Sequence, residues 1–136
     1  MAQTSRKVLG PGAYKTIVSR AITEADTNAT TELFEIPASS FVPPFGVSIE
    51  ITEAFAGGVP SIDVGDADAD GWIDTTDITE GTTGTYTGDG TAFAPTGKYY
   101  SSKDTLDVTL SASLTDGTAY VILRYWDMTA CDLAAA

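Results

Sequence analysis

The chain has 136 residues, of which 43% are hydrophobic, and a net charge of −12. This is the size of one globular domain, and the excess of carboxylates argues against nucleic acid or a membrane as a partner, because phosphate surfaces select basic proteins. Without histidine and with one cysteine, Cys131, the chain can form neither a Ser-His-Asp or Cys-His catalytic site nor an intrachain disulfide. We therefore expect a protein that is not an enzyme.

Residues 1–13 contain Gly10-Pro11-Gly12 and show no apolar periodicity, so we predict an extended N-terminal arm. Residues 1–20 hold four of the seven basic side chains and no acidic one, whereas the remaining residues carry a charge of −16. The candidate partner-binding residues are these four: Arg6, Lys7, Lys15 and Arg20. Their charge would let the arm lie on an acidic neighbour, including a second copy of the chain. The alternative is a solvated terminus.

Short apolar segments follow the arm in regular succession. Strands are predicted at residues 14–22, 30–36, 47–55, 59–64, 98–101, 105–110 and 118–128, and an extended segment at 41–45. In residues 47–55, the alternation places Val47, Ile49, Ile51 and Glu53 on one face. Residues 118–128 form the longest apolar run, rich in β-branched and aromatic side chains, and are predicted to be a central strand.

Turn signals separate these segments. Asp116-Gly117 predicts a β-hairpin, and the glycine- and threonine-rich residues 81–97 predict a long loop or a flexible hairpin, of the kind that often contacts partners. The pattern contains no amphipathic helix. We therefore predict an all-β fold: an antiparallel β-sandwich, jelly-roll-like, with an extended N-terminal arm. The predicted divisions are an arm at 1–13, a single sandwich domain at 14–130 and a C-terminal tail at 131–136.

Residues 61–80 hold seven carboxylates, and five of them have the spacing of a calcium loop: Asp66, Asp68, Asp70, Asp74 and Asp77. They occupy positions 1, 3, 5, 9 and 12 of an EF-hand loop, with glycine at position 6. The flanking residues are strand-like or rich in glycine and threonine, which excludes the two helices of an EF-hand. Two interpretations remain. One is a calcium loop on a β scaffold, and the other is an acidic turn whose aspartates hydrogen-bond their own backbone. We assign no metal site and no cofactor.

Residues 45–128 contain a distinctive series of short motifs: Val64-Gly65-Asp66, Asp70-Gly71-Trp72-Ile73-Asp74, Gly97-Lys98-Tyr99-Tyr100, residues 105–110 and the closing segment 120–128. In these motifs the segment resembles a group of small structural proteins of tailed bacteriophages. The resemblance implies a β-rich virion component without catalytic residues, and in particular a capsid decoration (cement) protein. Such a protein would be made in the host cytoplasm and would bind the outer capsid surface. Its partner would be the major capsid protein, it would form a homotrimer, and its arm would supply anchoring charges.

Two other functions remain open. One is a calcium- or carbohydrate-binding β-sandwich module, in which five aromatic side chains would form a platform for a sugar: Trp72, Tyr86, Phe93, Tyr99 and Tyr100. The competing interpretation of these aromatics is ordinary packing in the core and in hairpins. The other function keeps the virion but places the protein in the phage tail or neck.

Overall fold

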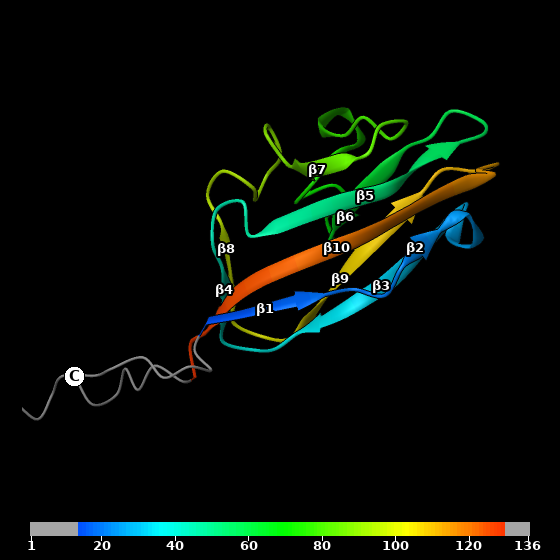
Figure 1. Cartoon of the computed structure of the whole chain (residues 1–136). Coiled ribbons are helices and arrows are strands. Elements are labelled where there is room, and N and C mark those ends of the chain that lie inside the picture. Colours follow the sequence, from blue (N-terminus) through cyan, green and yellow to red (C-terminus); the bar gives the residue numbers. More distant parts are fainter. Residues whose placement is uncertain (1–13, 130–136) are drawn as a thin grey trace, which may run out of the picture.

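The computed structural model describes residues 14–129, which form two antiparallel sheets packed face to face (Figure 1). The larger sheet contains β1 (Tyr14–Val18), β2 (Ile22–Thr23), β4 (Ser40–Val42), β5 (Val47–Ala56), β7 (Gly84–Thr87), β8 (Lys98–Tyr100) and β10 (Asp116–Asp127). The smaller sheet contains β3 (Ala29–Ile36), β6 (Ile62–Gly65) and β9 (Asp104–Leu110), in the order β3-β9-β6. The predicted all-β antiparallel sandwich is confirmed.

Helical structure within residues 14–129 is limited to two 3₁₀ turns, η1 (Glu24–Asp26) and η2 (Thr75–Asp77). No helix in this part of the chain is long and apolar enough to cross a membrane. The predicted arm at 1–13 and tail at 131–136 lie outside the described residues, so the domain divisions stay a prediction.

β10 is the central strand of the larger sheet, as predicted. On one side it pairs with β1 and β2, and on the other with β5 and β4. Its side chains alternate strictly: Ala119, Val121, Leu123 and Tyr125 are buried between the sheets, while the intervening residues are partly exposed on the outer face. The outer face of this sheet is therefore an open surface in the chain as described.

The core lies between the inner faces of β5 and β10 and those of β6 and β9. Ile49, Ile51, Val64 and Leu106 are almost completely buried there, and each contributes about 1.5–3 kcal/mol of apolar burial. Trp72, from the aspartate-rich loop, is the largest fully buried side chain. The loop is thus anchored in the core.

The structure corrects the predicted alternation at Glu53, which is exposed. Register shifts between β5 and β10 on both sides of Thr118 interrupt the alternation and turn Glu53 outward, where it accepts a hydrogen bond from the Gly117 amide at 3.3 Å. Gly117 has φ +131°, and a Cβ there would lie 2.1 Å from the Phe55 ring. Glycine is therefore required for the close approach of these two strands.

The predicted hairpin at Asp116-Gly117 is wrong, because both residues belong to β10 and the preceding strand, β9, lies in the other sheet. The predicted strand at 14–22 is divided into β1 and β2. At the break, the Ser19 hydroxyl accepts the Val121 amide at 2.9 Å, so a side chain replaces a backbone carbonyl in the ladder. The extended segment at 41–45 ends in a turn in which Phe45 has φ +57°.

Candidate functional site

The aspartate-rich loop folds back on the strand that leads into it. The Val64 amide donates to the Ile73 carbonyl at 2.9 Å and the Ile73 amide to the Val64 carbonyl at 3.0 Å, which closes the loop. At its start, a Cβ on Gly65 would lie 1.9 Å from the Asp68 carbonyl oxygen. The tight path of the loop therefore depends on glycine at this position.

Asp66 is buried, at 4% exposure, and accepts three hydrogen bonds. The donors are Lys98 Nζ at 2.6 Å, the Tyr100 hydroxyl at 2.8 Å and the Asp68 amide at 2.9 Å. Trp72 Nε1 donates in turn to the Tyr100 hydroxyl at 3.0 Å. Burial alone would raise the pKa of Asp66, but the hydrogen bonds from Lys98, Asp68 and Tyr100 outweigh it and hold the pKa below its usual range. Asp66 therefore stays a carboxylate that ties the loop to β8.

The other aspartates of the loop bind its backbone or face solvent. Asp74 caps η2 by accepting the Thr76 amide at 2.8 Å, and Asp77 accepts the Asp74 amide at 3.0 Å. Asp68, Asp70, Asp74, Asp77 and Asp89 contribute to the lining of a shallow depression of about 490 Å³. Contact with Asp68 raises the pKa of Asp70, as expected for neighbouring carboxylates.

These contacts match the acidic-turn interpretation of the loop. In a calcium loop, Asp66 would provide the first ligand, but its oxygens are occupied by Lys98, Tyr100 and the Asp68 amide. No group of acidic or thiol side chains within residues 14–129 is arranged to hold a metal ion. The residues present do not fit calcium in this geometry.

The five aromatics of the alternative sugar-platform interpretation do not form one surface. Trp72 and Tyr100 are buried, and Phe93 and Tyr86 pack against the core, whereas Tyr99 is 52% exposed. Tyr99 and Tyr100 are neighbours in β8, so their side chains point to opposite faces of the sheet. The competing interpretation, core packing, is confirmed for Trp72, Phe93 and Tyr100, and these five aromatics offer no common surface to a sugar.

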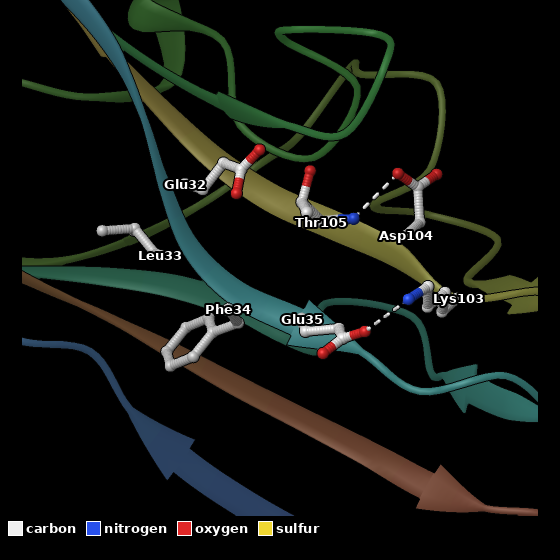
Figure 2. Close-up of a pocket in the computed structure, with 7 residues that line it drawn as sticks. All are labelled: Glu32, Leu33, Phe34, Glu35, Lys103, Asp104 and Thr105. Atoms are coloured by element: carbon white, nitrogen blue, oxygen red, sulfur yellow. Dashed lines mark hydrogen bonds and ion pairs between the residues drawn. The ribbon is translucent and has the colours of Figure 1, made fainter.

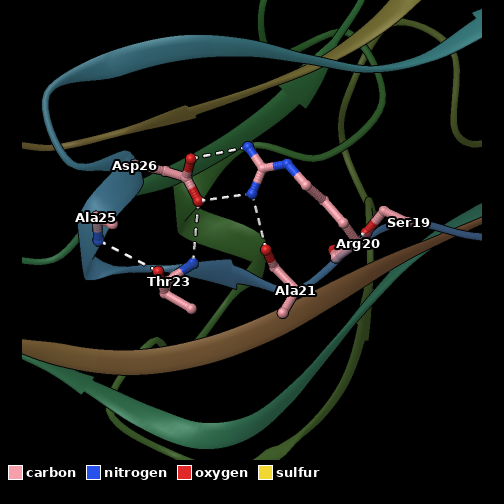
Figure 3. A network of polar contacts seen from close by, with 6 residues as sticks. All are labelled: Ser19, Arg20, Ala21, Thr23, Ala25 and Asp26. Atoms are coloured by element: carbon pink, nitrogen blue, oxygen red, sulfur yellow. Dashed lines mark hydrogen bonds and ion pairs between the residues drawn. The ribbon is translucent and has the colours of Figure 1, made fainter.

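The structure places two of the four candidate basic residues, while Arg6 and Lys7 lie outside the described residues. Lys15 is on β1, opposite Tyr125, and Arg20 follows the far end of the strand. Arg20 Nη2 contacts Asp26 Oδ1 at 2.8 Å, and its Nη1 donates to Asp26 Oδ2 at 3.1 Å (Figure 3). The hydrogen bonds from Arg20 lower the pKa of Asp26. The charge of Arg20 is therefore directed to its own chain, and the two residues are not brought together.

An aromatic row crosses the outer face of the larger sheet, on four strands. Tyr14 pairs with Trp126, Trp126 with Phe41, and Phe41 with Tyr99, so the four side chains lie on the same face of β1, β10, β4 and β8. The rings of Tyr14 and Trp126 are 4.6 Å apart, and Tyr14 and Tyr99 are 41% and 52% exposed. We call these four residues the aromatic row.

The surface beside the aromatic row also carries apolar side chains. Val18, 57% exposed, lies opposite the partly exposed Ile122. Arg124, between Ile122 and Trp126 on this face of β10, is the cation of the region, and its Nη1 lies 3.5 Å from the Ser48 hydroxyl. Aromatic and arginine side chains around a desolvated centre are the usual composition of protein–protein hot spots. This face is our candidate interface.

Sequence reasoning missed the aromatic row because its members come from four distant segments. The alternation in 118–128 indicates which side chains of β10 share a face, but nothing in the sequence gives the register that aligns Tyr14, Phe41 and Tyr99 with Trp126. The opposite face of the molecule, on the smaller sheet, has a different character. It carries Glu32 and Asp107, and the hydroxyls of Thr30 and Thr109 lie 2.9 Å apart there.

Three chains from phage capsid structures are similar to this one. A chain of the cyanophage Pam1 capsid matches with a TM-score of 0.64 and 14% identity, covering 92% of this chain and 93% of that one. A chain of the acid-stable capsid of Helicobacter pylori bacteriophage KHP30 matches with a TM-score of 0.61 and 13% sequence identity, covering 84% of this chain and 87% of that one. A chain of the Ralstonia phage GP4 capsid matches with a TM-score of 0.57 and 18% sequence identity, covering 92% of this chain and 93% of that one.

The chain shares the fold of these phage capsid chains. Because each match covers most of both chains, each matched chain is about as long as this one. At 13–18% sequence identity, the similarity to these chains shows a shared fold alone. No family model and no curated protein matches the sequence.

Proposed function

We propose that the chain is a non-enzymatic structural protein of a phage virion that decorates the outer surface of the capsid. In this proposal it binds the major capsid protein as a homotrimer and stabilises the head. The observation that carries the proposal is the likeness of fold over nearly the whole length of chains found in three phage capsids. The similar length of the matched chains supports a small accessory subunit.

The candidate interface supplies the contact in this proposal. A chain with a charge of −12 repels acidic neighbours over most of its surface, so the part of this face that holds the aromatic row, Val18 and Arg124 is the one best suited to close contact. We place this face against the shell, which leaves the acidic smaller sheet toward solvent. Arg6, Lys7 and Lys15 remain the proposed anchoring charges of the N-terminal region, whereas Arg20 is paired with Asp26.

The number of copies in purified virions tests the location. On the order of hundreds of copies per particle are expected, because a decoration protein repeats with the icosahedral symmetry of the shell. Quantitative mass spectrometry against the major capsid protein measures the ratio. About a dozen copies or fewer would instead assign the chain to the tail or neck, where rings of low symmetry are built. Absence from the particle would end the virion proposal.

Removing the exposed ends of the aromatic row tests the interface. In the variant Tyr14→Ser/Tyr99→Ser, the occupancy of the protein on shells that lack it is expected to fall about tenfold or more, as at interface hot spots. Re-addition to such shells and sedimentation measures the occupancy. Val59→Ser is the matched control, because Val59 is also apolar and is 85% exposed but lies outside this face. Equal loss in both variants, or no loss in the first, would contradict the assignment.

A further inference from the structure

A groove of about 520 Å³ lies along β3, the outer strand of the smaller sheet (Figure 2). It is lined by residues of β3, by the start of β9 and by the residue before β9: Glu32, Leu33, Phe34, Glu35, Lys103, Asp104 and Thr105. β3 pairs with β9 on one side, and no described strand covers its other edge. The groove therefore lies beside a strand whose outer edge is not paired with any other described strand.

The groove combines negative charge with two half-buried apolar side chains, Leu33 and Phe34, which lie on the other side of the β3 ribbon from Glu32 (Figure 2). Lys103 Nζ lies 3.4 Å from Glu35 Oε1, but both side chains are largely exposed, and Glu32 forms no ion pair with any residue from 14 to 129. Asp104 adds a third carboxylate. The register shift between Glu32 and Phe34 displaces Leu33 from the ladder, and Phe34 packs against the edge of the core.

A neighbouring carboxylate adds to the unbalanced charge. Asp107 lies directly opposite Glu32, and its Oδ1 is buried without a hydrogen-bond donor among the described residues. Burial raises the pKa of Asp107, and the charges of Glu32 and Asp104 act in the same direction. A cation bound beside Glu32 would relieve this repulsion. The groove therefore favours a ligand with positive charge next to apolar groups.

The chain itself contains such a ligand in its N-terminal arm. The sequence Arg6-Lys7-Val8-Leu9 places two cations beside two apolar side chains. The arm joins β1, which is the outer strand of the larger sheet on the same side of the sandwich as β3, and β1 starts at the end of the molecule where β3 finishes (Figure 1). Four residues lie between Leu9 and Tyr14, so the five Cα–Cα steps span up to about 17 Å, more than the roughly 10 Å between packed sheets.

We propose that this groove binds the chain's own N-terminal segment, with Arg6 and Lys7 against Glu32, Glu35 and Asp104, and Val8 and Leu9 against Leu33 and Phe34. The tether favours the arm of the same chain over that of a second copy, because a short linker gives an effective concentration of about a millimolar or more. This inference concerns the free protein and does not depend on the proposed place in the virion.

Charge reversal in the arm of the full chain tests the proposal. In Arg6→Glu/Lys7→Glu, the backbone amide resonances of residues 32–35 and 103–105 are expected to shift, while those of β10 stay in place as a control for the fold. The matched control is Thr4→Ala/Ser5→Ala, which changes two neighbouring residues of the arm but keeps both cations and adds no charge, and it should leave the groove resonances near their original positions. Unchanged groove resonances in the first variant would overturn the proposal.

Two further measurements identify the interaction and its source. Combining Arg6→Glu/Lys7→Glu with Glu32→Lys/Glu35→Lys should restore the bound-state shifts of Val8, Leu9 and Phe34, whereas either pair alone should lose them. Shifts that stay constant over a roughly tenfold dilution indicate the arm of the same chain. Shifts that disappear on dilution would overturn the own-arm assignment and point to a second copy. Failure of the charge swap to restore the shifts would overturn the ionic contact.

Discussion

Asp66→Ala is expected to destabilise the chain by about 2–4 kcal/mol at neutral pH. The substitution removes the acceptor of Lys98, Tyr100 and the Asp68 amide, and leaves the ammonium of Lys98 without its partner. Lys98 is 31% exposed, so it recovers part of its hydration and the loss stays below that of a fully buried pair. Denaturation in urea with and without the substitution measures the difference.

The pH dependence and a double-mutant cycle show whether the ion pair is responsible. Because the pKa of Asp66 is lower in the folded chain, its contribution is present above the unfolded value of about 3.9 and is lost as the pH falls through the folded pKa. The difference between wild type and Asp66→Ala should therefore shrink in acid below about pH 4. Against Lys98→Met, the cycle should show coupling of about 1 kcal/mol or more. A pH-independent difference and additive losses would contradict the ion-pair account.

Trp72→Ala is expected to cost about 3–5 kcal/mol, because it leaves a cavity in a region with no exposed surface. The substitution also removes the donor to the Tyr100 hydroxyl and the ring that lies 5.7 Å from Phe93. The loop that carries Asp66 would lose its anchor in the core. Thermal unfolding followed by circular dichroism measures the effect.

The second tryptophan of the chain is a matched control. Trp126 is partly exposed in the aromatic row and contacts the Tyr14 ring in a tilted arrangement, so Trp126→Ala should cost about 1 kcal/mol. Trp72→Phe should fall between the two, because it keeps most of the volume but loses the indole donor. Equal destabilisation by the two alanine variants would mean that Trp72 is not the core residue described above.

The strands could be predicted from the sequence because their apolar residues follow a period of two. β5, β9 and β10 were located within a few residues, and the central place of β10 followed from its long apolar run. The errors occurred where a contact between distant residues decides the local structure. The Ser19 hydroxyl divides the first strand, and the register shifts near Gly117 turn Glu53 outward.

The candidate site was less predictable than the fold. The spacing of the aspartates indicated a structured turn, but the partner that occupies Asp66 is Lys98, 32 residues later in the chain. Similarly, Tyr99 and Tyr100 were grouped in one sugar platform, although adjacent positions of a strand face opposite ways. The aromatic row depends on the pairing of four strands, which local patterns do not encode.

The pairing of β10 also determines when the chain can fold. Its partners β1, β2, β4 and β5 all lie in residues 14–56, whereas β10 itself is synthesised last. A nascent chain on the ribosome therefore holds these four strands without the central strand of their sheet until residues 116–127 have been synthesised. Folding of the larger sheet consequently waits for β10, and a premature stop before residue 116 removes the centre of that sheet.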